Sequence, residues 1–319
     1  MVEKTYPELI PNLSTCKSPQ QMMGPLAKTY FARKIGVDPR DIRVVSVMPC
    51  TAKKDEAQRP NMSDAGTGDP DVDYVLTTRE LASLIRMHRP AIHFNNLPDE
   101  QFDSVLGEST GSATIFGVTG GVMEAALRTA IALTAPPGTK TMPRLEFEEV
   151  RGLEGVRQAT VDLNGLPLRV AVANGGTNLH KVCRAILRAK HRGEEPPFHF
   201  VELMACKGGC IGGAGNPKDA VTPDLLQRRA RAVYSIDERS RLRRSHENPE
   251  IKSIYDNFLG EPLGHMSHKL LHTTYTDRLS GDFEQGDHLV AEDFPSAAQG
   301  HDATGLGGGE GVDPGRGRF

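Results

Sequence analysis

The sequence contains no apolar run long enough to cross a membrane and no N-terminal signal for secretion. A membrane-spanning helix needs about 18 consecutive apolar residues, and no stretch of this 319-residue chain approaches that length. Its first residues, MVEKTYPELIPNLS, lack the basic segment followed by an apolar segment that marks a secretory signal. These absences predict a soluble protein of the cytoplasm.

A basic surface suited to nucleic acid is also missing. The formal net charge is −3 and the pI is about 6.4, and basic residues form no stripe with interleaved aromatic residues. No glycine-rich loop of the dinucleotide-binding or P-loop type is present. We therefore expect no nucleic-acid partner and no nucleotide cofactor.

Cysteine is scarce, and the five cysteines are an odd number in a long chain without secretory features. A disulfide framework is the expectation for small secreted domains, whereas cysteines in a cytoplasmic protein more often serve metal binding or thiolate chemistry. The positions of the cysteines must therefore decide what they do.

Short apolar runs alternate with helical patterns along the chain. Residues 42–47, 72–76, 168–173 and 199–203 are rich in β-branched residues and predict buried parallel strands. Between these runs, Thr77 and Glu80 form a capping box that opens a helix toward His88, and further helices are predicted over 120–133 and after Gly176. Strands alternating with helices predict an α/β fold. Residues 60–73 are polar and predict a surface loop.

Three cysteines follow directly after predicted strands. Cys50 ends the run VVSVMPC, and the strand before Cys206 continues into the sequence CKGGC, which ends at Cys210. Open α/β folds place ligands at the carboxyl ends of their strands. The glycines between and after these two cysteines, through Gly215, let the backbone wrap closely around a centre. Thiolates in such a loop suit an iron–sulfur cluster or zinc, and the alternative is that the cysteines are inert core residues.

Four segments together resemble the catalytic domain of iron-only (FeFe) hydrogenases. They are MPCTAKKDE (48–56), ELMACKGGCIGGAGNP (202–217), NLSTCKSPQQMMG (12–24) and IFGVTGGVMEAALR (115–128). The resemblance covers residues 1–278 and includes HKLLHTTYTDR near its end. It implies a two-lobed domain, with sheets flanked by helices and the metal site between the lobes. It also divides the chain into a large-subunit-like catalytic region (1–218), a small-subunit-like helical segment (219–278) and a tail (279–319) whose glycine-rich, apolar-poor composition predicts disorder.

The resemblance implies a 4Fe-4S cubane joined to a two-iron subcluster that carries carbon monoxide, cyanide and a bridging dithiolate. Cys50, Cys206 and Cys210 match three of the four cubane ligands, with Cys210 in the bridging position. The family's fourth ligand belongs to a T-S-C-C-P-x-W segment, which the sequence does not contain. We therefore expect a fragment or a mispredicted start, and no hydrogen evolution from the chain as it stands. Cys16 does not match a family ligand, and Cys183, inside an amphipathic helical pattern, predicts a core residue.

The same matching implies roles for residues around these cysteines. Lys53 would donate hydrogen bonds to cyanide, a contact that suits a compact ammonium group. The side chains that would line the dithiolate side are Ser18, Pro19 and Gln20. Ser14 would relay protons, and the water-excluding wall would comprise Met48, Phe116 and Met204. Without the motifs, Lys53 would be interpreted as a solvated lysine, the wall residues as ordinary core, and Glu56 and Glu202 either as supporting carboxylates or as capping or solvated residues.

The implied activity is the reversible two-electron reduction of protons to hydrogen. An electron donor such as ferredoxin would act through upstream domains that are absent here, and hydrogenase maturation factors would supply the two-iron unit. Two alternatives stay open. The chain would be a non-catalytic relative of the iron–sulfur assembly type, which lacks the two-iron centre, or a structural zinc protein that uses the same thiolates.

Overall fold

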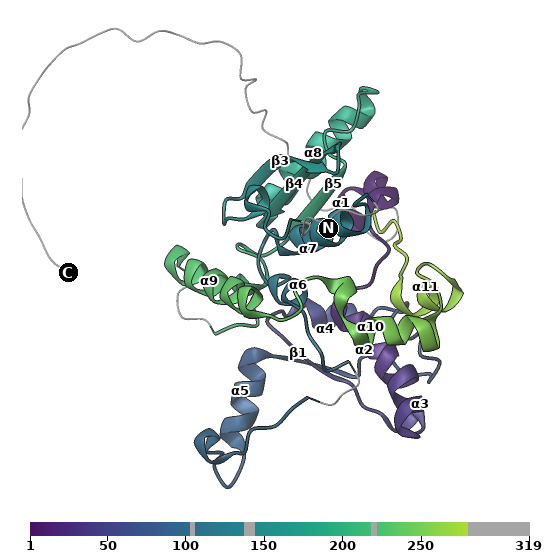
Figure 1. The fold of residues 1–319 in the computed structure, drawn as a ribbon, viewed down its shortest axis with the longest axis vertical. Coiled ribbons are helices and arrows are strands. Elements are labelled where there is room, and N and C mark those ends of the chain that lie inside the picture. Colours follow the sequence, from purple (N-terminus) through teal and green to yellow (C-terminus); the bar gives the residue numbers. More distant parts are fainter. Residues whose placement is uncertain (103–105, 137–143, 218–221, 280–319) are drawn as a thin grey trace, which may run out of the picture. The chain divides into compact units, whose positions relative to one another are not determined.

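The computed structural model describes residues 1–102, 106–136, 144–217 and 222–279 (Figure 1). Residues Met1–Leu279 form one compact unit. Apart from Leu279, the predicted disordered tail lies outside the described residues. In the part of the chain that the structure describes, no helix is both long enough and apolar enough to cross a bilayer.

Helices and strands are interspersed along the chain as far as residue 204, which agrees with the predicted α/β class. The strands are β1 (Val45–Met48), β2 (Tyr74–Thr77), β3 (Val156–Leu163), β4 (Leu166–Asn174) and β5 (Phe200–Met204). The α-helices are α1 (Val2–Thr5), α2 (Pro19–Leu26), α3 (Ala32–Ile35), α4 (Ala52–Ala57), α5 (Thr78–Met87), α6 (Gly111–Ile115), α7 (Gly121–Leu133), α8 (Gly176–His191), α9 (Pro223–Arg239), α10 (Pro249–Ile254) and α11 (His265–Leu271).

A two-stranded parallel sheet leads to the first cysteine. β1 and β2 pair from Val45 opposite Tyr74 to Met48 opposite Thr77, so both predicted strands exist but begin two or three residues later than expected. The Thr77–Glu80 capping box is confirmed, because each residue's side chain accepts a hydrogen bond from the other's backbone amide. The box fixes the point where β2 ends and α5 begins.

The second sheet has the order β3-β4-β5. β4 and β5 run parallel, as predicted, but β3 pairs antiparallel with β4. The expectation of parallel strands alone was therefore wrong for this sheet. The hairpin turns at Asn164 and Gly165, which both have positive φ angles (52° and 94°) and form the kind of two-residue turn that matches the twist of antiparallel strands. This sheet carries the glycine-rich loop, because β5 runs out into Cys206.

Helices cover both faces of this second sheet. Val170 and Val172 of β4 pack in one buried cluster with Met123 and Leu127 of α7. The alternate residues of the strand point the other way, and Ala173 packs with Leu179 and Val182 of α8. The sheet is therefore held rigidly between two helices, and the loop after β5 starts from a fixed position.

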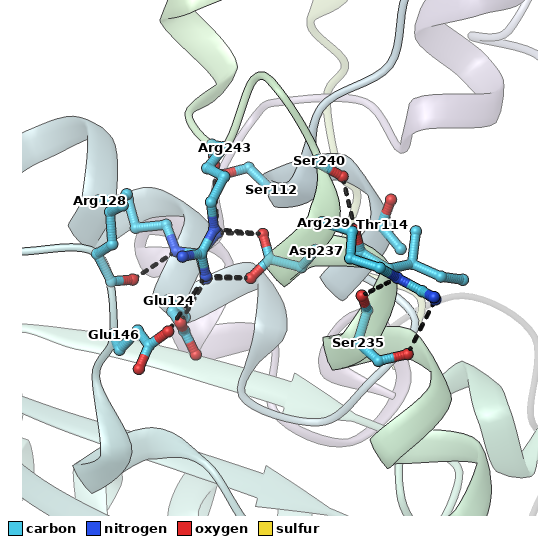
Figure 2. Close-up of polar contacts among 12 residues, drawn as sticks. Ser112, Thr114, Glu124, Arg128, Glu146, Ser235, Asp237, Arg239, Ser240 and Arg243 are labelled. Carbon is cyan, nitrogen blue, oxygen red and sulfur yellow. Dashed lines mark hydrogen bonds and ion pairs between the residues drawn. The ribbon is translucent and has the colours of Figure 1, made fainter.

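A buried ion network joins α7 to α9 (Figure 2). Arg128 of α7 contacts Glu124 one turn earlier and Asp237 of α9, and Arg243 reaches the same aspartate from the segment after α9. The side chains of Glu124, Arg128 and Asp237 have no exposed surface. The contacts tie the region that follows residue 222 to the helix that covers the second sheet.

The first sheet, by contrast, has one open apolar face within the described residues. Val45, Val47 and Tyr74 lie on this face with exposed fractions of 52%, 41% and 60%. The adjoining helix α5 contains no buried residue, although it is amphipathic. Parallel sheets are usually covered on both faces, so this region differs from the rest of the unit.

Candidate functional site

Cys50 lies two residues beyond the end of β1, and Cys206 lies two residues beyond the end of β5. Both cysteines are partly exposed, while Cys210 is exposed. The two strand ends belong to different sheets. What brings them together is the glycine-rich segment that follows β5.

The loop from Cys206 to Cys210 is shaped by two glycines in the left-handed region. Gly208 and Gly209 have φ angles of 78° and 87°, where a side chain would be strained. The Gly208 amide donates to Oδ1 of the buried Asn174, at the end of β4, over 3.0 Å, and the Gly208 carbonyl accepts from the Thr119 amide at 3.1 Å. The loop is thus fastened to both the sheet and the start of α7.

The continuation of this loop packs directly on the backbone around Cys50. The Gly215 amide donates to the Pro49 carbonyl at 3.0 Å. A methyl group on Gly215 would lie 2.6 Å from the Cys50 nitrogen, and one on Gly213 would collide with the Pro49 carbonyl oxygen. Only glycine permits this approach at either position. The two cysteine motifs are therefore neighbours in space.

The three thiols of these motifs influence one another electrostatically. Burial raises the pKa of Cys206, and the nearby Cys50 raises it further. Burial likewise raises the pKa of Cys210, with added contributions from Cys50 and Cys206 that Lys53 opposes. Ionising these sulfurs together is costly without a compensating cation. A positively charged metal centre would supply that compensation and displace the protons.

A cavity of about 300 Å³ opens beside Cys50. It is lined by residues from three distant parts of the sequence: Cys16, Lys17, Ser18, Cys50, Ala52, Lys53, Asp55, Glu56, Arg59, Met62, Thr273 and Tyr275. Three of the predicted site residues, Ser18, Cys50 and Lys53, thus face one space. Cys16, whose role the sequence left open, faces it as well.

Polar contacts hold the wall of this cavity. Lys53 Nζ lies 2.8 Å from Glu56 Oε2, and the Ser18 hydroxyl donates to the same oxygen at 2.9 Å. Behind the wall, the buried Gln20 donates to the Lys53 carbonyl at 3.2 Å and accepts from the Ser46 hydroxyl at 2.8 Å. The helix α4 is therefore attached to the start of α2 and to β1.

The other predicted site residues do not line the cavity. Met48 packs against the buried cluster beneath the first sheet, and the Met204 sulfur contacts the loop at Gly209. Phe116 is half-buried between α6 and α7. Ser14 is exposed, and its hydroxyl accepts from the Cys16 amide at 3.3 Å. Pro19 is exposed at the first position of α2.

Two further sequence interpretations have clear structural counterparts. Cys183 is 1% exposed in the core between α8 and the N-terminal residues. This burial confirms the prediction that Cys183 is a core residue. Glu202 is buried and accepts from the amides of Gly120 and Met123 at 2.6 and 2.8 Å. It therefore caps the start of α7, and burial raises its pKa despite these hydrogen bonds.

Sequence reasoning missed the C-terminal contribution to the cavity. Thr273 and Tyr275 reach its wall from the segment after α11, and Arg59 is placed there by a two-point contact with Glu3 at 2.8 and 3.0 Å. The spacing of Thr273 and Tyr275 could have indicated that both side chains face one side, because residues two apart in an extended segment do so. Asn174 was also missed, although it begins the sequence Asn-Gly-Gly.

The three cysteines of the two motifs are ligands of the type that binds iron–sulfur clusters. Cys50, Cys206 and Cys210 supply soft thiolates on a glycine backbone that approaches closely. No three His, Cys, Asp or Glu side chains in the described ranges converge closely enough to hold a single metal ion. The described residues bring three cysteines to this place.

Two family models match this chain. Residues 1–214 match the model of the iron-only hydrogenase large subunit, C-terminal domain, and residues 223–278 match that of the iron hydrogenase small subunit. This chain belongs to the iron-only hydrogenase family. The predicted family and fold class are thereby confirmed.

Individual relatives show how far the similarity extends. The NADP-reducing hydrogenase subunit HndD of Solidesulfovibrio fructosivorans is 49% identical over 276 residues, which are 86% of this chain and 45% of HndD. A structure of a variant of FeFe hydrogenase HydA1 from Chlamydomonas reinhardtii matches with a TM-score of 0.70 and 40% identity over 87% of this chain and 73% of that one. Protein NAR1 of Arabidopsis thaliana is 32% identical over 84% of this chain and 57% of NAR1. The chain thus spans less than half of HndD.

Proposed function

We propose that this chain is part of the catalytic domain of an FeFe hydrogenase, whose reaction is the reversible reduction of two protons by two electrons to hydrogen. One observation carries the proposal, namely the position of Cys50 between two features. On one side the glycine-rich loop with Cys206 and Cys210 packs on its backbone. On the other side lies the cavity with Lys53 and Ser18.

In this proposal a 4Fe-4S cubane would be held by Cys50, Cys206 and Cys210, and Cys210 would also serve the two-iron subcluster. The cavity beside Cys50 would hold the two-iron unit with its carbon monoxide, cyanide and dithiolate ligands. When bound, such a centre supplies the electrons and the iron at which protons are reduced. The raised pKa values of Cys206 and Cys210 suit this use, because a bound cation would favour their thiolate forms.

The surrounding residues would bind, orient and exclude water. The Lys53 ammonium would donate to a cyanide nitrogen, which is a charge-assisted contact. Polar and small groups at the start of α2 would border the dithiolate, and Ser14, at the exposed end of that segment, would pass protons toward solvent. The residues of these two groups are Ser14, Ser18, Pro19 and Gln20, and those that would exclude water are Met48, Phe116 and Met204.

Electrons would come from a ferredoxin-like donor through other cluster-bearing domains, and maturation factors would deliver the two-iron unit in the cytoplasm. Residues 1–218 would form the large-subunit-like part of the domain. Residues 219–278 would form the small-subunit-like part, which contributes Thr273 and Tyr275 to the cavity.

Anaerobic reconstitution with iron and sulfide tests the cluster assignment. We expect bound iron and sulfide, and an electron paramagnetic resonance signal after reduction, that fall strongly in the Cys50→Ser, Cys206→Ser and Cys210→Ser variants. Cys183→Ser is the matched control, because this thiol is buried in a different core. A chain that binds one zinc ion and gives no signal would refute the cluster.

The second candidate is a non-catalytic iron–sulfur protein, which the 32% identity to protein NAR1 keeps open. Infrared spectroscopy separates the two after co-expression with maturation factors. The hydrogenase assignment requires bands from carbonyl and cyanide ligands, and the alternative predicts a cubane signal without them. The higher identity to HndD and the TAKK sequence after Cys50 favour the hydrogenase.

A further inference from the structure

One oxygen of the Glu56 carboxylate contacts two residues that line the cavity. This oxygen, Oε2, lies 2.8 Å from Lys53 Nζ and accepts from the Ser18 hydroxyl at 2.9 Å. Lys53 and Glu56 are three residues apart in α4, so both side chains project on the same side of the helix. Their side chains are 26% and 23% exposed. The pair therefore sits at the rim of the cavity and is neither buried nor fully solvated.

The other cations of the cavity are held by carboxylates that do not line it. Lys17 is bound by Asp64 and Asp71, and Arg59 by Glu3. Their charges are thus neutralised from outside the cavity. Lys53 differs, because the carboxylate that contacts it also belongs to the cavity wall.

The main chain of Lys53 is fixed while its ammonium group depends on Glu56. The Lys53 carbonyl accepts a hydrogen bond from Gln20, and Gln20 in turn accepts one from the Ser46 hydroxyl. The four methylene groups of the lysine side chain leave the ammonium free to turn between Glu56 and the open cavity. A group in the cavity that needs this ammonium must compete with the carboxylate for it.

We propose that Glu56 is a positioning residue that sets the anion affinity of this cavity by holding the Lys53 ammonium until an anion displaces it. The ligand class is a small anion, or an anionic metal complex whose cyanide groups accept hydrogen bonds. The proposal rests on the proposed function for the identity of the natural ligand. The competition itself depends only on the contacts among Ser18, Lys53 and Glu56.

Replacing the carboxylate by an amide of the same shape tests this competition. Glu56→Gln keeps an oxygen that the Ser18 hydroxyl can donate to, and it releases the ammonium. A partly exposed ion pair is worth up to about 1 kcal/mol, so its loss is expected to tighten anion binding about three- to fivefold. Asp55→Asn is the matched control, because Asp55 also lines the cavity but is not the carboxylate that contacts Lys53. It changes the net charge equally.

Two probes keep this inference separable from the proposed function. Thiocyanate, titrated into the purified chain and followed by nuclear magnetic resonance, measures affinity for a simple anion. A synthetic di-iron dithiolate dianion with carbonyl and cyanide ligands, followed by its infrared bands on the reconstituted chain, measures affinity for the complex. We expect Glu56→Gln to tighten thiocyanate binding, Asp55→Asn to change it less than about twofold, and Lys53→Met to abolish the gain when combined with Glu56→Gln.

Equal effects of Glu56→Gln and Asp55→Asn would overturn the proposal, because bulk charge would then explain both. Weaker binding in Glu56→Gln, or no thiocyanate binding by any variant, would overturn it as well. Thermal unfolding of each variant checks that the fold is retained. If the thiocyanate results hold but no variant binds the di-iron complex, the competition stands and the proposed two-iron occupant of the cavity fails.

Discussion

Arg128 and Asp237 form a two-point ion pair with no exposed side-chain surface. Both guanidinium–carboxylate contacts, Nη1 to Oδ1 and Nη2 to Oδ2, measure 2.7 Å (Figure 2). Glu124 accepts from the same guanidinium at 2.7 Å, and Arg243 donates to Asp237 at the same distance. Because the two residues are 109 positions apart, this contact fastens α9 to the helix that covers the second sheet.

Removing one partner of this pair should be costly. Arg128→Met leaves the carboxylates of Glu124 and Asp237 buried with fewer donors, and breaking a buried pair in this way costs about 3–5 kcal/mol. We expect that loss in the free energy of unfolding, measured by denaturant titration. The exposed pair of Arg228 and Asp224, with side chains 64% and 68% exposed, is the control, and Arg228→Met should cost less than about 1 kcal/mol. Similar losses in both variants would contradict the buried role.

Close packing of the glycine-rich loop on Cys50 should be necessary for cluster binding. Gly213→Ala places a methyl group against the Pro49 carbonyl oxygen, so the loop must move away from Cys50. We expect iron and sulfide bound after reconstitution to fall several-fold, while Gly176→Ala, whose added methyl meets no atom within 4 Å, binds as the wild type does. Full cluster content in Gly213→Ala would mean that the loop tolerates displacement.

Local features of the site and the fold could be predicted from the sequence. The cysteines were identified because each follows an apolar run and because glycines surround two of them, and both signals are local. The strands β1, β2, β4 and β5 were found for the same reason. By contrast, β3 was missed because its sequence, VRQATVDL, alternates polar and apolar residues at a half-exposed strand instead of forming an apolar run.

Contacts between distant segments could not be derived from the sequence. The side chain of Asn61 donates to Thr273 at 2.6 Å across 212 positions, and this contact helps to hold the segment after α11 near the cavity. No local pattern encodes such a pairing. The same holds for Glu56, whose interaction with Lys53 has helical spacing but whose interaction with Ser18 spans 38 positions. The sequence therefore indicated the two cysteine motifs at the strand ends better than it indicated the walls of the cavity.

Acid should loosen the attachment of the N-terminal segment to the cavity wall. The hydrogen bonds from Arg59, with help from the Thr276 amide, lower the pKa of Glu3 to about 2 from the usual 4.5. A lowered pKa in the folded state means that the stabilisation is complete above pH 4.5 and is lost as the pH falls toward 2. We expect Glu3→Gln to lower the free energy of unfolding by about 1–3 kcal/mol at pH 7.

The difference between wild type and Glu3→Gln should shrink below pH 4.5, which chemical denaturation at a series of pH values would measure. Glu148→Gln is the control, because that carboxylate contacts Arg151 with a side chain that is 73% exposed and should contribute little at any pH. A difference between wild type and Glu3→Gln that stays constant from pH 7 to pH 3 would contradict the role of the Glu3 charge.

The open face of the first sheet should promote self-association. Val45 and Val47 expose 52% and 41% of their surfaces beside Tyr74, and exposed apolar patches of this kind favour contacts between molecules. We expect the double variant Val45→Thr, Val47→Thr to lose less than about 1 kcal/mol of stability and to form fewer oligomers in light scattering. Val75→Thr is the control on the opposite face, where the residue is 8% exposed. Burying the new threonine hydroxyl at this position should cost about 1–3 kcal/mol without reducing association. If instead the double variant lost more stability than Val75→Thr and formed as many oligomers as the wild type, the face would already be covered.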